Sequence, residues 1–71
     1  MLRPIRYGRF GLAEDPTGQI VTWMVGERTY LADVIGVYRR ESPAAFMLQT
    51  RHFNGELGPE VVASAVRLVL P

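Results

Sequence analysis

The sequence predicts an all-β fold: a small antiparallel barrel or curved sheet of five strands, with a short helical turn near the C-terminus. Two observations support this prediction of one small all-β domain. Short apolar runs that are rich in β-branched and aromatic residues alternate with turn-forming residues at regular intervals. The chain of 71 residues is long enough for one domain, residues 1–71, with a single core.

The first half of the chain predicts two strands and two turns. A first strand is expected over residues 5–12, although two glycines interrupt it. Residues 14–18, Glu-Asp-Pro-Thr-Gly, predict a turn because proline presets φ and glycine tolerates positive φ. The second strand is expected over residues 19–25, and Gly26-Glu27 is short enough to close a two-residue hairpin.

Two further strands are expected in the middle of the chain. Residues 28–38 alternate in strand fashion with mostly apolar side chains on both faces, which predicts a central or bending strand with a bulge or bend at Gly36. Residues 39–43 are charged and turn-forming, and we expect an exposed loop there. The fourth strand is expected over residues 44–53, before the tight-turn dipeptide Asn54-Gly55.

The C-terminal segment allows two interpretations. A helix could start at Gly58-Pro59-Glu60, which would give an α+β fold with a four-stranded sheet and a C-terminal helix. However, such a helix would be apolar nearly all round, and its four valines favour a strand. We therefore expect a short helical turn over residues 62–65 and a strand over residues 66–70.

This segment also carries a family resemblance. Residues 62–69, Val-Ala-Ser-Ala-Val-Arg-Leu-Val, resemble the end of Src-homology-3-like small barrels, where one 3₁₀ turn with small or Ser residues precedes the closing strand. The resemblance implies a barrel topology and no site residues. The aromatic-rich opening motif of the members that bind proline-rich peptides is missing, and Trp23 comes too early for their groove tryptophan.

Composition excludes several classes of site. There is no cysteine, so disulfides, thiolate metal sites and a cysteine nucleophile are excluded. The net charge of +1 is too small to indicate nucleic acid or a membrane as the partner. No apolar run approaches the length of a membrane span, and the N-terminus lacks the apolar stretch of a secretion signal. We expect a cytoplasmic protein without a cofactor, a small-molecule substrate or a membrane partner.

No group of residues has the spacing of a catalytic site. His52 is the only histidine, and no spacing links it to a serine nucleophile or an orienting acid. His52 with Glu56 is a weak set of ligands for a transition metal. The sequence therefore predicts that the protein is not an enzyme.

The arginines and aromatic residues supply the binding candidates. All eight Lys and Arg positions hold arginine, whose planar fork pairs with anions and stacks on rings. On a small barrel, arginines beside exposed rings can hold single-stranded nucleic acid. The sequence pI of about 8.3, however, lies below the value of more than 9 that is typical of nucleic-acid domains. The candidate binding residues are Arg3, Tyr7, Arg9, Arg39, Arg40, Arg51 and Phe53.

The surplus of apolar side chains favours an interaction role. The second, third and fourth predicted strands carry apolar residues on both faces, and so small a sheet cannot bury them all. We expect a second copy or another protein to cover part of that surface. The leading hypothesis is a non-enzymatic protein-interaction module, either a homo-oligomer or a small subunit of a larger cytoplasmic or viral assembly. The alternative is a small nucleic-acid-binding β-barrel.

Overall fold

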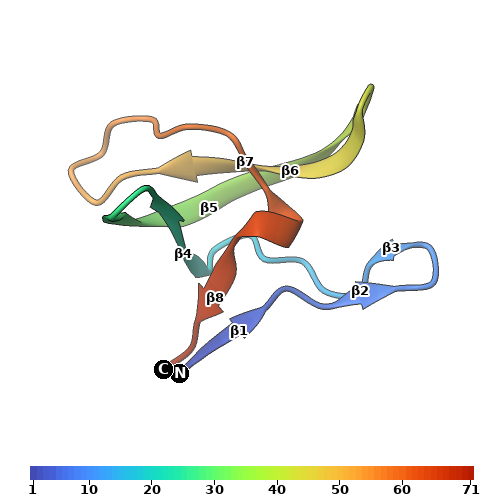
Figure 1. The fold of residues 1–71 in the computed structure, drawn as a ribbon, viewed down its shortest axis with the longest axis horizontal. Helices are drawn as coiled ribbons and strands as arrows, with labels where there is room; N and C mark the ends of the chain where they lie inside the picture. Colours follow the sequence, from blue (N-terminus) through green and yellow to red (C-terminus); the bar gives the residue numbers. More distant parts are fainter.

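The computed structural model describes residues 1–71 and consists of strands with one 3₁₀ turn (Figure 1), which confirms the all-β class. Six strands form an antiparallel sheet in the order β1-β8-β4-β5-β6-β7, and β2 and β3 form a separate two-stranded sheet. The large sheet has two edges, β1 and β7, so it remains open rather than closing into a barrel. The elements are β1 (Leu2–Pro4), β2 (Tyr7–Gly8), β3 (Gly11–Leu12), β4 (Ile20–Val25), β5 (Arg28–Glu41), β6 (Ala44–Arg51), β7 (Val61–Val62), η1 (Ala63–Ala65) and β8 (Arg67–Val69).

The prediction of one strand over residues 5–12 is wrong. The chain forms the edge strand β1, and then turns back on itself through the β2–β3 hairpin, in which Gly8 pairs with Gly11 around an Arg9-Phe10 turn. Gly11 has a φ of +132°, which lies outside the range of an extended strand. Glycine adopts such a positive φ readily because it has no Cβ. The arginines at positions 3, 6 and 9 therefore do not share one strand.

The turn signals downstream act as expected. Gly26 adopts a φ of +61° between the paired residues Val25 and Arg28, which confirms the two-residue hairpin of β4 and β5. The bulge predicted at Gly36 is also confirmed, because the register of β5 on β6 shifts between Val34 and Gly36.

The exposed loop predicted over residues 39–43 is wrong for its first three residues. Residues 39–41 continue β5, because they pair with residues 44–46 of β6 across the turn at Ser42-Pro43. The strand β4 pairs only with the first part of β5, up to Asp33. The distal part of the β5–β6 hairpin therefore extends beyond β4 as a two-stranded arm (Figure 1).

The C-terminal segment forms the 3₁₀ turn η1 and the strand β8, so the predicted turn and strand are confirmed and the alternative C-terminal helix is wrong. The strand β8 lies between β1 and β4 and pairs with both, which a helix could not do. This pairing brings the two ends of the chain together (Figure 1), and the Leu70 amide donates to the Met1 carbonyl at 2.8 Å. No helix here is long and apolar enough to cross a membrane.

The core lies on one face of the large sheet, and its buried cluster takes side chains from β4, β5, β6, η1 and β8 and from two residues between elements, Ile5 and Val66. Trp23 and Tyr30 face each other across β4 and β5 with stacked rings whose centroids are 5.7 Å apart. Thr50, the buried polar side chain, donates to the Pro59 carbonyl at 2.7 Å and so satisfies its hydroxyl. The buried cluster consists of Ile5, Val21, Trp23, Ala32, Val34, Leu48, Ala63, Val66 and Leu68.

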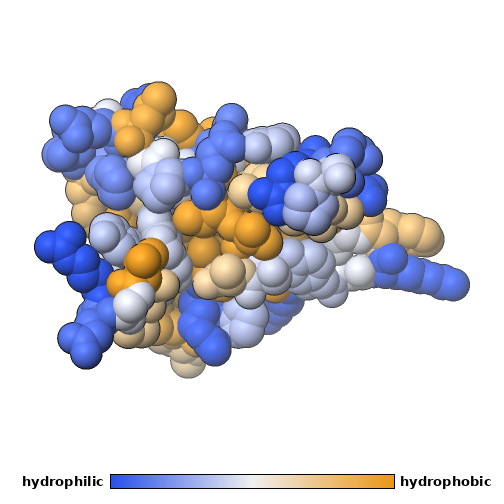
Figure 2. All heavy atoms as spheres, turned by 45° about the horizontal axis from the view of Figure 1, so that its top comes forward, coloured by the Kyte–Doolittle hydropathy of each residue, from blue (hydrophilic) through white to orange (hydrophobic).

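The other face of the sheet leaves large apolar side chains in solvent. Met24 is 65% exposed on β4, and Tyr38 is 39% exposed on β5. Figure 2 shows apolar side chains reaching the surface in several separate places among hydrophilic ones. The sheet therefore buries one face well and the other incompletely.

Replacing Leu48 by Ala tests the core. The Leu48 side chain is fully buried, and its truncation is expected to lower the free energy of unfolding by about 2–5 kcal/mol, as in other cores. Urea unfolding followed by circular dichroism measures the loss. Met24→Ala is the control, and we expect it to change stability by less than about 0.5 kcal/mol because its side chain is exposed. Equal losses in the two variants would contradict this description of the core.

Candidate functional site

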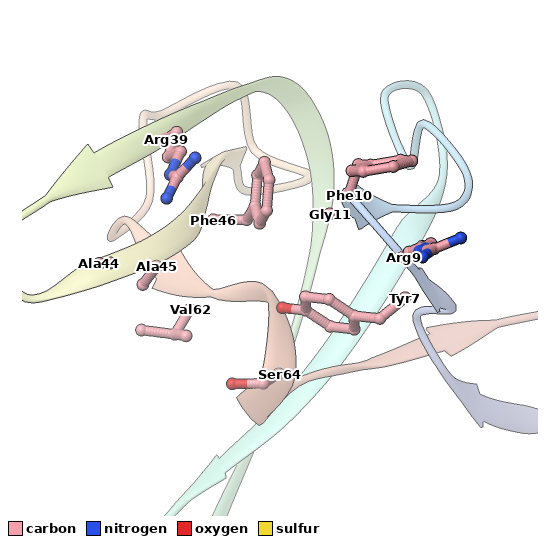
Figure 3. Close-up of a pocket in the computed structure, with 10 residues that line it drawn as sticks. All are labelled: Tyr7, Arg9, Phe10, Gly11, Arg39, Ala44, Ala45, Phe46, Val62 and Ser64. Atoms are coloured by element: carbon pink, nitrogen blue, oxygen red, sulfur yellow. The ribbon is translucent and has the colours of Figure 1, made fainter.

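A groove of about 680 Å³ lies between the β2–β3 hairpin and the distal part of the β5–β6 hairpin (Figure 3). Two hairpins that are far apart in the sequence form its walls, and Val62 of β7 and Ser64 of η1 also line it. The lining combines three aromatic rings (Tyr7, Phe10 and Phe46), two cations (Arg9 and Arg39) and the smaller residues Gly11, Ala44, Ala45, Val62 and Ser64.

The ring of Phe46 forms the floor of the groove and holds the β2–β3 hairpin against β6. A Cβ placed on Gly11 would lie 2.6 Å from Cζ of Phe46, so the ring rests directly on the glycine backbone. Tyr7 meets the same ring edge to face, with the centroids 6.3 Å apart. In Figure 3 the Tyr7 hydroxyl points across the groove toward the side that carries Val62. These contacts fix the width of the groove.

A salt bridge holds the base of the same hairpin. Both guanidinium ends of Arg3 donate to the Glu14 carboxylate, at 2.6 and 2.7 Å, and the backbone amide of Arg6 donates to Glu14 at 2.9 Å. The Arg3 hydrogen bonds, followed by the Arg6 amide, lower the pKa of Glu14 from 4.5 to about 2. Glu14 in turn raises the pKa of Arg3. This salt bridge, with its two hydrogen bonds, joins β1 to the segment that follows β3.

The two groove arginines have no such partner. The Arg3–Glu14 pair is the only salt bridge in the structure, and Arg9 and Arg39 are both exposed. The guanidinium carbon of Arg9 lies 5.8 Å from the centroid of the Phe10 ring, which orients it along the rim. No acidic side chain lines the groove. The groove therefore presents two free cations around an apolar floor.

A smaller hollow adjoins the groove beyond Phe10 and Phe46, and two acids line it. Glu14 is engaged by Arg3, and Asp15 accepts the Thr17 amide at 3.0 Å. Hydrogen bonding from the Thr17 side chain, followed by that from the Thr17 amide, lowers the pKa of Asp15. Both carboxylates therefore have local structural partners and do not neutralise Arg9 or Arg39 by direct contact.

The structure brings together three of the seven predicted binding residues: Tyr7, Arg9 and Arg39. Arg3 is occupied by Glu14, and Arg40 donates to the Pro43 carbonyl at the tip of the β5–β6 hairpin. Arg51 and Phe53 lie at the far end of β6 and do not line the groove.

Seven of the ten lining residues were not among the predicted binding residues, and three of these seven, Phe10, Phe46 and Ser64, offer a ring or a hydroxyl to a ligand. Phe10 is 93% exposed at the tip of the β2–β3 hairpin, and two glycines around it were the available signal for that turn. Nothing local in the sequence distinguishes Phe46, because its role depends on the hairpin that covers it.

The other end of the molecule holds the single histidine. His52 is half-buried, its amide donates to the Glu56 carbonyl at 2.8 Å, and its side chain lies beside Gly58.

Tyr38 donates its hydroxyl to Glu60, and this hydrogen bond raises the pKa of Tyr38. No group of three or more His, Asp or Glu side chains has the geometry of a metal site.

No known protein family, curated protein or solved structure matches this chain. The groove is therefore assigned from the residues that line it and from their charges and contacts.

The Arg3–Glu14 pair predicts a loss of stability in acid. Folding lowers the pKa of Glu14 from 4.5 to about 2, so its ionised form stabilises the folded state above pH 4.5, and this contribution is lost as the pH falls from 4.5 through about 2. We expect Glu14→Gln to flatten that part of the stability profile, measured as urea midpoints between pH 7 and pH 2. Glu27→Gln, at the exposed β4–β5 turn, is the control. An unchanged profile in Glu14→Gln would show that the pair does not contribute.

The contact of Gly11 with Phe46 gives a second prediction. Gly11→Ala places a methyl group against the Phe46 ring at a φ of +132°, and should lower the free energy of unfolding by more than the 1–3 kcal/mol or so that a strained backbone costs. Gly18→Ala is a matched control, because its φ is +86° and nothing lies within 4 Å of the added carbon. Urea unfolding measures both variants. If Gly11→Ala were no more destabilising than Gly18→Ala, the ring contact would not hold the hairpin.

Proposed function

We propose that the protein is a non-enzymatic interaction module that binds an acidic, partly apolar segment of a protein in the groove. One observation carries the proposal: two arginines without acidic partners, Arg9 and Arg39, flank the apolar floor formed by Phe46. Guanidinium groups pair with carboxylates through two parallel hydrogen bonds, and Arg and Tyr are enriched in protein interfaces.

The shape of the groove supports a peptide segment as the ligand. It lies open between two hairpins, so an extended chain could enter and leave at its ends (Figure 3). An apolar side chain would contact the rings of Tyr7 and Phe46, while acidic neighbours would reach the arginines on either side. Because the rings are already packed against one another and against Gly11, little ordering would accompany binding.

The same observations favour a protein over a nucleic acid. Single-stranded nucleic acid is bound by a positively charged track with several stacking rings along it. Here Arg3 is occupied by Glu14, and Arg51 and Phe53 lie away from the groove. Only Arg9 and Arg39 remain on the groove surface, which suits a short anionic segment better than a polynucleotide backbone.

We also propose that the chain is related in topology to the Src-homology-3-like small barrels. The position of η1 directly before the closing strand β8 supports this relation, and the open sheet departs from it. The groove residues here come from this chain's own geometry and are not transferred from that family.

The binding proposal is tested by fluorescence anisotropy with a labelled ten-residue peptide of alternating Glu and Leu. We expect saturable binding that weakens with added salt and that falls at least tenfold in the double variant Arg9→Glu/Arg39→Glu, because each lost charged hydrogen bond is worth about 1.5–3 kcal/mol. Arg67→Glu, on exposed β8 outside the groove, is the single-charge control and should bind nearly as well as the native chain.

Two further probes distinguish the partner class. A peptide of Gln and Leu should bind at least tenfold more weakly than the Glu and Leu peptide, since it lacks the carboxylates. A ten-nucleotide oligo(dT) should bind more weakly than the acidic peptide. Tighter binding of oligo(dT), or acidic-peptide binding that survives the double groove variant, would overturn the proposal.

A further inference from the structure

One exposed segment of this chain has the chemistry that the groove would select. The segment between β6 and β7, residues 54–60, contains Leu57, whose side chain is 70% exposed, between two exposed glutamates, Glu56 and Glu60. We name residues 54–60 the acidic loop. Glu56 makes no salt bridge, and Glu60 accepts one hydrogen bond from Tyr38 and keeps further acceptor capacity.

Backbone hydrogen bonds hold the acidic loop in a defined shape. The Gly58 amide donates to the Thr50 carbonyl at 3.0 Å, and the Thr50 hydroxyl donates to the Pro59 carbonyl at 2.7 Å. Leu57 forms an isolated β-bridge with Arg51. The exposure of Leu57 is therefore a property of an ordered loop, and little conformational entropy would be lost when it binds.

Leu57 of the acidic loop lies beside Arg51, at the end of β6 that is remote from the groove, whereas Glu60 directly precedes β7. In Figure 1 the loop after β6 lies at one end of the long axis, and the β2–β3 hairpin lies at the other. The molecule extends 33 Å along that axis. A chain in this fold therefore cannot place its own Leu57 in its own groove, but it can offer the loop to the groove of a second copy.

We propose that the acidic loop of one copy occupies the groove of the next, with Leu57 on the Phe46 ring and the loop glutamates facing Arg9 and Arg39. This inference rests on the proposed function and names the segment that fills the groove. The two surfaces are different, so the contact is heterologous and leaves one groove and one loop free at the ends of each dimer. Repetition gives a closed ring or an open chain of molecules.

The complementary charges support this occupant. The groove has two cations and no acid, and the acidic loop has two acids and no cation. Both carry an apolar centre, Phe46 in the groove and Leu57 in the loop.

The test uses two variants that each remove one of the two surfaces. The groove variant is Arg9→Glu/Arg39→Glu, and the loop variant is Glu56→Lys/Leu57→Ser, both altering exposed residues. Size-exclusion chromatography with light scattering at low salt, up to about 1 mM protein, detects even weak association. We expect the native chain and the Arg67→Glu control to oligomerise and each variant alone to be monomeric. Circular dichroism checks that every variant retains the native fold.

Mixing the two variants gives the decisive measurement. The loop variant keeps an intact groove and the groove variant keeps an intact loop, so an equimolar mixture should form a one-to-one dimer that does not grow further. A mixture that stays monomeric would overturn the head-to-tail contact, and so would native oligomers that survive both variants, because the interface would then lie elsewhere. A native chain that is monomeric throughout but binds the acidic peptide would overturn this inference and leave the proposed function standing. A monomer that also fails to bind the peptide would overturn both.

Discussion

The groove depends on the contact between the Phe46 ring and the backbone of Gly11. The β2–β3 hairpin forms few hydrogen bonds of its own and is separate from the large sheet, so something must fix it relative to the β5–β6 hairpin. The absence of a side chain at Gly11 lets the ring approach, and the φ of +132° at the same residue turns the hairpin back over it. One residue type thus satisfies a steric and a conformational requirement, while the Arg3–Glu14 pair holds the other end of the hairpin.

The limited size of the core explains why so much apolar surface stays exposed. A chain of 71 residues buries a smaller fraction of its surface than a larger domain does, and here one face of the sheet supplies nearly all of the buried cluster. The opposite face contributes Met24, Leu31 and Ile35 to the surface, each more than 40% exposed. Such a domain gains relatively little stability from its own core, so contacts with a partner would add a substantial share.

The sequence predicted those parts of the fold that local chemistry decides. The Gly26-Glu27 turn, the bulge at Gly36 and the turn before the last strand all follow from residues within a few positions of one another. The predictions failed where distant pairing decides: residues 39–41 have the composition of a loop, yet they pair with β6 and become strand. The same reason limits the site. Arg9 and Arg39 could be named as candidates from residue type, but only the folding of one hairpin against another shows that they share a groove and that Arg51 does not.

The positions of the charged side chains say more about possible partners of this protein than its net charge does. Eight arginines and seven acids nearly cancel, which argued against a strongly anionic partner when only composition was considered. In the fold, no acid lines the groove, and the two acids of the adjoining hollow are engaged, Glu14 by Arg3 and Asp15 by the Thr17 amide. Glu56 lies in the loop before β7, next to Leu57, which pairs with Arg51 at the end of β6 that is remote from the groove. The two groove arginines therefore give a nearly neutral chain a local positive patch, whose field extends over about one Debye length, 10 Å at 0.1 M salt.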